Sequence, residues 1–264
     1  MYAFELHRAK DVADAAALLG QSGGRALAGG QSLVAALKFR LAQPGTLVDL
    51  SGIKELAGIR KEGNALVIGA MTTHASIAAS KDVQDSIPVL AALAELIGDR
   101  QVRNMGTIGG SIANADPAAD WPAAVLALDA TIITNKRKIP AAQFFTGLYE
   151  TTLAADEIIT SISFPTPKRG AYEKFRNPAS RFALVGVLVA QMADGSVRVA
   201  VTGAGPSVFR CQPLEAALAK SFSVDSARAV KIAASGLNHD LHGSAEYRAH
   251  LISVLAGRAV AACA

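Results

Sequence analysis

Two short stretches of this sequence combine paired glycines with a neighbouring hydroxyl residue. The first contains Gly29-Gly30, and the second, about eighty residues later, contains Gly109-Gly110. Glycine has no Cβ atom, so such stretches can press backbone N–H groups against phosphate oxygens. One glycine pair usually marks only a tight turn, but its repetition predicts a pyrophosphate held from two sides. The residues expected at this phosphate are Leu27, Ala28, Gly29, Gly30, Gln31, Ser32, Leu33 and Val34 in the first stretch, and Thr107, Ile108, Gly109, Gly110 and Ser111 in the second.

The first glycine pair is followed by an apolar helical pattern over residues 33–40. We expect Ser32 to cap this helix, which would direct its positive end at the same anion. Neither stretch ends in Gly-Lys-Ser/Thr, and neither contains Gly-x-Gly-x-x-Gly. These absences argue against an ATP site and against a nicotinamide cofactor bound in the Rossmann manner.

The composition is that of a folded protein. The 264 residues are 51% hydrophobic and 18% charged, enough for one large domain or two to three small ones. No run of eighteen uncharged apolar residues occurs, and charged residues fill the N-terminus where a signal peptide would need an apolar core. We therefore expect a cytoplasmic protein without a membrane span.

Cysteine content and charge restrict the partners. Cys211 and Cys263 are the only cysteines, too few for a four-thiolate cluster, so any iron–sulfur centre must belong to another chain. The net charge is +4, but the basic residues are dispersed and aromatic residues make up only 5%. We expect no nucleic-acid partner.

The elements that would position the glycine pairs can be read from periodicity and turn residues. We expect helices over residues 12–19 with a stop at Gly20, 33–40, 88–97, 121–128 with Asp120 as N-cap, 226–237 and 245–262, and one beginning at residues 72–76. Expected strands cover residues 25–28, 46–50, 65–70, 131–134, 158–164, 182–192 and 197–202, the last two joined by an Asp194-Gly195 hairpin turn. Changes in pattern predict three domains, 1–51, 52–168 and 169–264.

At the two glycine pairs the sequence resembles the FAD-binding medium subunits of the molybdenum hydroxylases, the family of xanthine dehydrogenase and aerobic carbon monoxide dehydrogenase. The resemblance extends to residues 69–74, 116–120 and 174–183, in the family's order. It implies an α+β protein: a two-subdomain FAD-binding fold of the vanillyl-alcohol-oxidase/PCMH type, followed by a C-terminal α+β domain with an antiparallel sheet and helices. FAD would lie between the first two parts.

The resemblance also implies roles for single residues. Ile97 and Ile159 would sandwich the adenine ring, or else simply pack in the core. Asp120 would contact ribityl or ribose hydroxyls, with helix capping as the alternative, and Lys174 would lie near the flavin, unless it is a solvated surface lysine. Phe182 falls where some relatives place an aromatic ring beside the flavin, although a strand Phe more often packs in a core.

Four further positions complete the expected site. In the Thr72-Thr73-His74 stretch, we expect Thr72 to contact the cofactor and His74 to support it without direct contact. The other histidines show no metal-ligand spacing. Gln31 replaces a histidine of some relatives and keeps a donor. Ser111 replaces a frequent asparagine with a shorter side chain, so phosphate binding there would depend on the Gly109 and Gly110 amides.

By resemblance, the chain is the FAD-carrying medium subunit of a heterotrimer and has no catalytic side chains of its own. Electrons would come from a large molybdopterin subunit through a small [2Fe–2S] subunit and leave to an external acceptor, NAD or a quinone. Such complexes are expected to be dimers of heterotrimers. The alternatives are a stand-alone FAD oxidoreductase of the related fold, disfavoured by the block 174–183, and a flavin-free scaffold subunit, disfavoured by the intact glycines.

Overall fold

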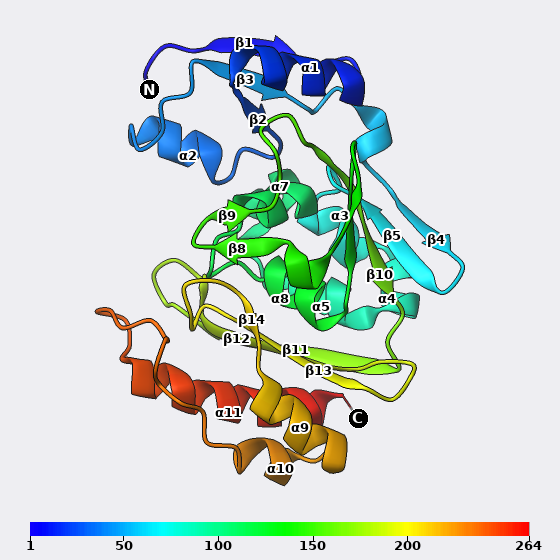
Figure 1. The fold of residues 1–264 in the computed structure, drawn as a ribbon, viewed down its shortest axis with the longest axis vertical. Helices are drawn as coiled ribbons and strands as arrows, with labels where there is room; N and C mark the ends of the chain where they lie inside the picture. Colours follow the sequence, from blue (N-terminus) through cyan, green and yellow to red (C-terminus); the bar gives the residue numbers. More distant parts are fainter. Residues whose placement is uncertain (264) are drawn as a thin grey trace.

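The computed structural model describes residues 1–263 and arranges them around three sheets, one above the other (Figure 1). The first sheet is parallel, with strand order β1-β3-β2. Its central strand β3 is buried along its whole length, because α1 covers it and strands flank it on both sides. The bounds in this part are β1 Glu5–Arg8, α1 Val12–Ser22, β2 Arg25–Leu27, α2 Leu33–Lys38, β3 Thr46–Asp49 and the short 3-10 helix Lys54–Leu56.

Helix α1 begins as expected and ends later than expected. The Asp11 carboxylate accepts a hydrogen bond from the Asp14 N–H at 2.8 Å, which caps the first turn. The helix continues through Gly20 to Ser22 and ends at Gly23, whose φ of 59° is left-handed. The predicted stop at Gly20 is wrong because Gly23 supplies the left-handed C-terminal residue that ends a helix at low cost.

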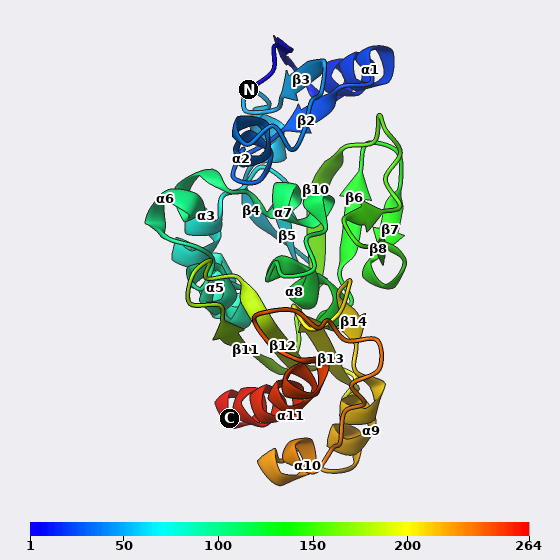
Figure 2. The ribbon, with the colours of Figure 1, turned by 90° about the vertical axis from the view of Figure 1, so that its left-hand side faces the viewer.

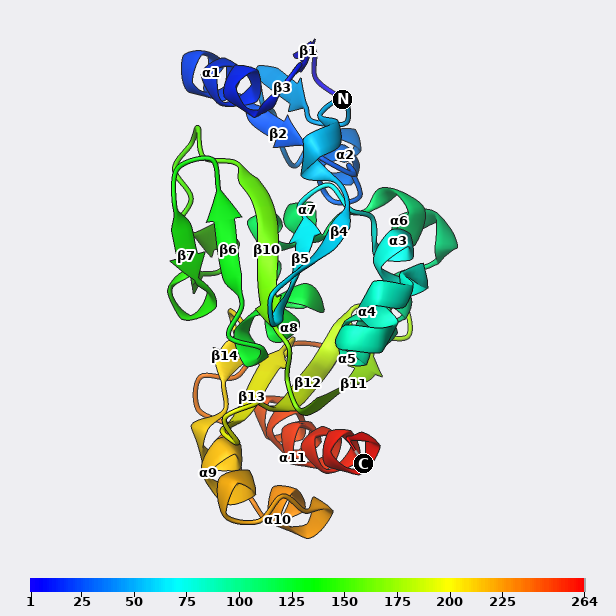
Figure 3. The same ribbon diagram turned by 90° about the vertical axis from the view of Figure 1, so that its right-hand side faces the viewer.

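The second sheet is antiparallel in its β-ladders, with order β4-β5-β10-β6-β7, and helices α7 and α8 lie behind it in Figure 3. Ile162 of β10 pairs with Ile68 and Ile132 at the centre of the register. Its elements are β4 Ile59–Glu62, β5 Ala65–Gly69, α3 His74–Ala79, α4 Lys81–Ser86, α5 Pro88–Glu95, α6 Arg100–Met105, α7 Ile108–Asn114, α8 Trp121–Ala127, β6 Thr131–Thr134, β7 Lys138–Pro140, a 3-10 helix Ala141–Gln143, the hairpin β8 Phe145–Gly147 and β9 Glu150–Thr151, and β10 Ile159–Pro165.

The third sheet is antiparallel, with strands β11 to β14 in chain order. Strand β12 is buried on both faces, because α11 packs against one side and α8 against the other. This double burial explains the unbroken apolar run of its sequence. The bounds are β11 Arg169–Arg176, β12 Ala183–Gln191, β13 Val197–Thr202, β14 Phe209–Arg210, α9 Gln212–Lys220, α10 Val224–Arg228 and α11 Ala245–Ala262.

Two expectations about the C-terminal part have different outcomes. The Asp194-Gly195 turn is confirmed, and Gly195 has the positive φ of 85° that such turns need. The helix predicted over residues 226–237 is wrong, since α10 ends at Arg228. Val230, Ile232 and Leu237 pack against the C-terminal core from an irregular segment, and their spacing imitates a helical period.

The α+β fold is confirmed, whereas the domain boundaries near residues 51 and 168 stay a prediction.

Candidate functional site

The two glycine pairs lie against each other where the first sheet meets the second. A Cβ atom placed on Gly110 would be 3.3 Å from the Cβ of Ala28. A Cβ on Gly29 would be 2.8 Å from the Cα of Gly106 and would overlap the carbonyl of Met105. The turn between β2 and α2 can therefore approach the α6–α7 junction only because these positions lack side chains. In Figure 2, α2 lies above α7, and α6 lies to its lower left.

The first glycine pair carries backbone donors that the protein does not use. In the part of the chain that the structure describes, the N–H groups of residues 28–33 donate to no protein acceptor, and the first bonded amide of the turn is Val34, which donates to the Gly30 carbonyl at 3.0 Å. Consecutive unpaired N–H groups at the start of a helix form a site for an anion. This turn therefore fits a phosphate group.

The predicted capping by Ser32 is wrong. Ser32 has helical backbone angles, φ −102° and ψ −53°, and its hydroxyl makes no cap hydrogen bond. A capping side chain needs an extended backbone to reach back to the second or third helical N–H. Gln31 is exposed, and its side-chain amide donates to the Gly29 carbonyl at 3.2 Å.

The second glycine pair begins helix α7 and uses its amides internally. The Gly109 N–H donates to the Ala70 carbonyl at 2.8 Å, and the Gly110 N–H donates to the Thr107 hydroxyl at 3.2 Å. The Ile108 N–H donates to the Thr72 carbonyl at 3.1 Å. These amides are bonded within the protein in this structure, and the phosphate contacts expected of Gly109 and Gly110 stay a prediction. Ser111 is half-buried, and its hydroxyl has no hydrogen-bond partner within residues 1–263.

A buried ion pair joins the second and third sheets. Lys174 of β11 donates from Nζ to Oδ2 of Asp120 at 2.9 Å and to the Leu96 carbonyl at 3.3 Å. The side chains of Lys174 and Asp120 are 1% and 5% exposed, so the solvated-surface alternative for Lys174 is wrong. The Asp120 side chain does not cap α8, so that alternative is wrong as well.

Tyr172 completes this buried group. Its hydroxyl donates to Oδ1 of Asp120 at 2.5 Å. Burial raises the pKa of Asp120, while Lys174 and Tyr172 oppose the rise by stabilising the carboxylate. Burial and the neighbouring Asp120 charge raise the pKa of Tyr172 well above its usual range, so the phenol stays protonated and remains a donor. Sequence reasoning missed Tyr172, and its position two residues before Lys174 on one strand was the available signal.

The remaining expected contacts have mixed outcomes. The Thr72 hydroxyl donates to the Gly58 carbonyl at 3.1 Å and accepts from the Gly58 N–H at 2.9 Å, so it holds the chain before β4. Ile159 and Ile97 both pack on the largest core, Ile159 fully and Ile97 partly buried. Phe182 is 46% exposed and precedes β12, so its core-packing alternative is wrong.

His74 has a buried partner that the sequence did not indicate. It is 4% exposed, and Nδ1 accepts a hydrogen bond from the Trp121 indole at 3.0 Å. Burial, aided by the charge of Arg103, lowers the pKa of His74 to about 4. A Cβ on Gly106 would be 2.7 Å from Nε2, so the neutral ring lies directly beneath the glycine that faces Gly29.

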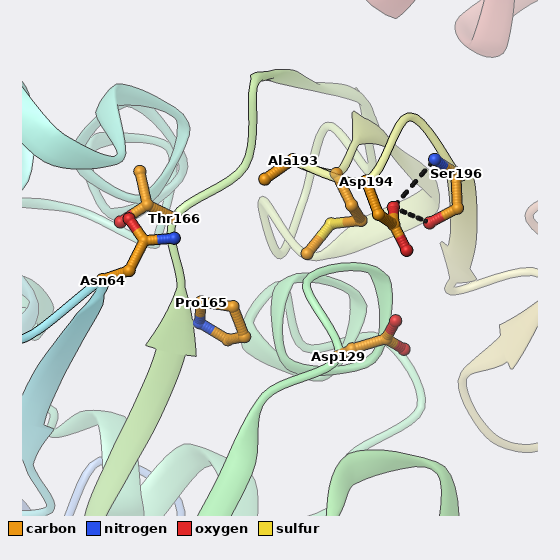
Figure 4. Close-up of a pocket in the computed structure, with 8 residues that line it drawn as sticks. Asn64, Asp129, Pro165, Thr166, Ala193, Asp194 and Ser196 are labelled. Carbon is orange, nitrogen blue, oxygen red and sulfur yellow. Dashed lines mark hydrogen bonds between the residues drawn. The ribbon is translucent and has the colours of Figure 1, made fainter.

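Two shallow hollows in the surface lie away from the glycine pairs. One of about 270 Å³ is lined by Asn64, Asp129, Thr166 and Asp194, and Figure 4 shows the Asp194 carboxylate turned to Ser196. Its carboxylates would repel an anion. Within residues 1–263, no group of three His, Cys, Asp or Glu residues could hold a metal ion, and no helix is long and apolar enough to cross a membrane.

This fold, with a glycine turn of unpaired amides between two sheets, fits a protein that binds a phosphate-containing cofactor. Residues 2–167 match the family model of the FAD binding domain in molybdopterin dehydrogenase. The carbon monoxide dehydrogenase medium chain of Hydrogenophaga pseudoflava is 39% identical over 97% of this chain and 96% of its own length. The nicotine 6-hydroxylase medium subunit of Paenarthrobacter nicotinovorans is 38% identical over 89% of this chain and 87% of its own.

Solved structures agree with these relatives. Carbon monoxide dehydrogenase from Hydrogenophaga pseudoflava superposes with a TM-score of 0.89 at 37% identity, covering 99% of this chain and 97% of that chain. The present chain therefore belongs to the FAD-binding family of the molybdopterin dehydrogenases. It is a medium, FAD-carrying subunit of the molybdenum hydroxylase type, an oxidoreductase subunit with FAD as its cofactor. The resemblance noted in the sequence is confirmed.

Proposed function

We propose that this chain takes electrons from a small [2Fe–2S] subunit and passes them through FAD to an external acceptor, NAD or a quinone. The electrons would originate at a large molybdopterin subunit, in a cytoplasmic dimer of heterotrimers. The observation that carries the proposal is end-to-end similarity to medium chains: the match to the Hydrogenophaga pseudoflava medium chain spans 97% of this sequence. A subunit named as one chain of a larger dehydrogenase has partners that perform the remaining chemistry.

The unpaired amides of residues 28–33 support the placement of the pyrophosphate. They provide donors without a protein acceptor, at the positive end of α2. Gly110 and Ala28 lie in contact across the site, so we propose that the second glycine pair shapes the phosphate pocket through packing rather than through its N–H groups. Ser111, with a hydroxyl free of protein partners, is the proposed polar contact from this side.

Asp120 and Lys174 support the placement of the sugar and the flavin. They form the buried ion pair between the second and third sheets, and we propose that Asp120 faces the ribityl or ribose hydroxyls and Lys174 the flavin. Thr72 would act by holding the backbone at Gly58, and Ile97 and Ile159 would offer the apolar faces for adenine. FAD, when bound, supplies the exchange of electrons between one-electron and two-electron partners, and the protein supplies orientation and charge.

The test is to purify the chain together with the proteins that bind it in its native host. We expect one FAD per chain, released by heat, and co-purified subunits that contain [2Fe–2S] clusters and molybdopterin. The complex is then reduced with dithionite and mixed with NAD or with a soluble quinone, and the rate of flavin reoxidation identifies the acceptor. A flavin-containing chain that purifies alone and turns over without partners would contradict the proposal in favour of a stand-alone oxidase.

A further inference from the structure

The segment that leads to Asp120 is held by the third sheet, which lies outside the matched FAD-binding region of residues 2–167. The Thr202 hydroxyl lies 2.6 Å from the Ala119 carbonyl and 2.8 Å from the Pro117 carbonyl. The Gly203 N–H donates to the same Pro117 carbonyl at 2.6 Å. The ends of β12 and β13 thus hold the backbone of residues 117–119. The carboxylate of the next residue, Asp120, is held by Tyr172 and Lys174 of β11.

Tyr172 reaches that carboxylate through a gap in the neighbouring strand. Gly186 of β12 is paired with Lys174 in the register, which makes it a diagonal neighbour of Tyr172, the partner of Leu188. A Cβ atom on Gly186 would overlap the Tyr172 hydroxyl and would be 2.9 Å from the ring carbon that bears it. It would also be 2.8 Å from Cγ2 of Thr202. Because Gly186 has an ordinary negative φ in a strand, conformational freedom does not explain a glycine here, whereas the space for Tyr172 does.

The hydroxyl of Tyr172 occupies one oxygen of Asp120 and Lys174 occupies the other. A buried carboxylate with both oxygens bonded is held in one orientation, and it in turn holds the ammonium of Lys174. Removing the phenolic O–H would leave one oxygen of this carboxylate without a donor at a site that is 5% exposed.

We propose that Tyr172, in the space left by Gly186, is a positioning residue of the FAD site: its hydroxyl orients Asp120 and thereby Lys174 toward the bound cofactor. This inference rests on the proposed roles of Asp120 and Lys174 at FAD. It makes the affinity for FAD depend on the third sheet, which carries both Tyr172 and Gly186.

The experiment compares wild type with Tyr172→Phe, using Tyr247→Phe as the matched control. Tyr247 contacts Phe175 of the same strand β11 through its ring and is 41% exposed. Each full-length protein is freed of flavin and titrated with FAD by fluorescence quenching. We expect Tyr172→Phe to raise the dissociation constant of FAD about tenfold, as for a lost hydrogen bond to a charged group, and Tyr247→Phe to leave it within about twofold.

The pH dependence of binding separates positioning from a general loss of structure. The charged and titratable groups around Asp120 are Tyr172, Lys174 and Arg176 of β11, with neutral His74 behind the adjacent Trp121. Without the phenol, Asp120 binds a proton more readily, so the FAD affinity of Tyr172→Phe should fall more steeply with decreasing pH than that of wild type. The comparison is made well above pH 4, because the pKa of His74 is about 4.

Gly186→Ala tests the same contact from the opposite strand. It should weaken FAD binding in the wild-type background and add little in the Tyr172→Phe background, because both changes remove one hydrogen bond. Unchanged FAD affinity in Tyr172→Phe, or an equal loss at every pH accompanied by a lower unfolding midpoint, would overturn the positioning role. Failure of the wild-type protein itself to bind FAD would instead overturn the proposed function.

Discussion

The indole N–H of Trp121 donates a 3.0 Å hydrogen bond to Nδ1 of His74, a residue 47 positions earlier in the chain. Because Nδ1 accepts, the ring proton of neutral His74 must be on Nε2, the nitrogen beside Gly106. Gly106 in turn faces Gly29 of the anion-binding turn. Trp121 is fully buried, so this stack connects the core of the second sheet to the glycine turn of the first.

The buried His74 should make the free energy of unfolding depend on pH. The folded protein holds the pKa of His74 near 4, below its usual 6.5, so the unfolded chain binds the proton more readily between these values. The stabilisation is complete above about pH 6.5 and should decrease by up to about 3 kcal/mol as pH falls toward 4. The measurement is urea unfolding at several pH values for wild type and His74→Gln. A difference between the two that stays constant with pH would contradict this prediction.

Gly29→Ala should prevent FAD binding. Its new methyl group would overlap the Met105 carbonyl and push the turn away from Gly106, which moves the unpaired amides. We expect at least a tenfold loss of FAD affinity, measured as bound flavin after purification and by titration. Gly45→Ala is the control, since a Cβ at Gly45 meets no atom within 4 Å. Normal flavin content in Gly29→Ala would rule out this turn as the phosphate site.

Serine and threonine at the two glycine pairs should differ in their contribution to stability. The Thr107 hydroxyl caps α7 by accepting from the Gly110 N–H, so Thr107→Ala should lower the free energy of unfolding by about 1 kcal/mol. The Ser32 hydroxyl caps nothing, and Ser32→Ala should change it by less than about 0.5 kcal/mol. Chemical denaturation without FAD checks both values. Equal losses would show that Ser32 also caps its helix.

Removing one partner of the buried ion pair should lower the free energy of unfolding more than replacing both partners. Lys174→Met leaves the Asp120 carboxylate buried without its cation, which should destabilise the flavin-free protein by about 3 kcal/mol. The double variant Asp120→Leu/Lys174→Met leaves no buried charge at this site and should recover part of that loss. Both free energies are read from urea unfolding. A double variant no more stable than Lys174→Met would refute the assignment of desolvation as the cause.

Glu157 should stabilise the turn before β10 more than the neighbouring Asp156 does. Its carboxylate accepts from Arg137, Thr134 and the Ala154 N–H, which lowers the pKa of Glu157 to about 2. Its stabilisation is therefore present above about pH 4.5 and lost as pH falls toward 2.

Glu157→Gln should cost about 2 kcal/mol in unfolding free energy at neutral pH, because three donors face a neutral amide. Asp156→Asn is the matched control: it removes the exposed pair with Lys136 and should have little effect. Unfolding curves of the two variants at pH 7 and at pH 3 make the comparison. If Glu157→Gln behaves like Asp156→Asn at pH 7, the buried carboxylate does not stabilise the turn.

Local patterns in the sequence determined much of the protein. The periodicity and capping residues of residues 245–262 fix α11, and the Asp194-Gly195 turn fixes the hairpin of β12 and β13, because turn geometry and burial period are local properties. The two glycine pairs also identified the meeting point of the first two sheets, since only residues without Cβ atoms permit that approach.

The tertiary structure decided how each of the two glycine pairs can act. Whether an amide is free depends on acceptors far along the chain: Ala70 takes the Gly109 N–H, whereas no residue within 1–263 takes those of residues 28–33. The ion pair of Asp120 and Lys174 and the bond from Tyr172 join residues more than fifty positions apart, beyond the reach of any periodicity. The sequence alone determined which residues could approach a phosphate, and the fold decided which of them have donors left to bind it, because hydrogen bonds are satisfied across the whole molecule.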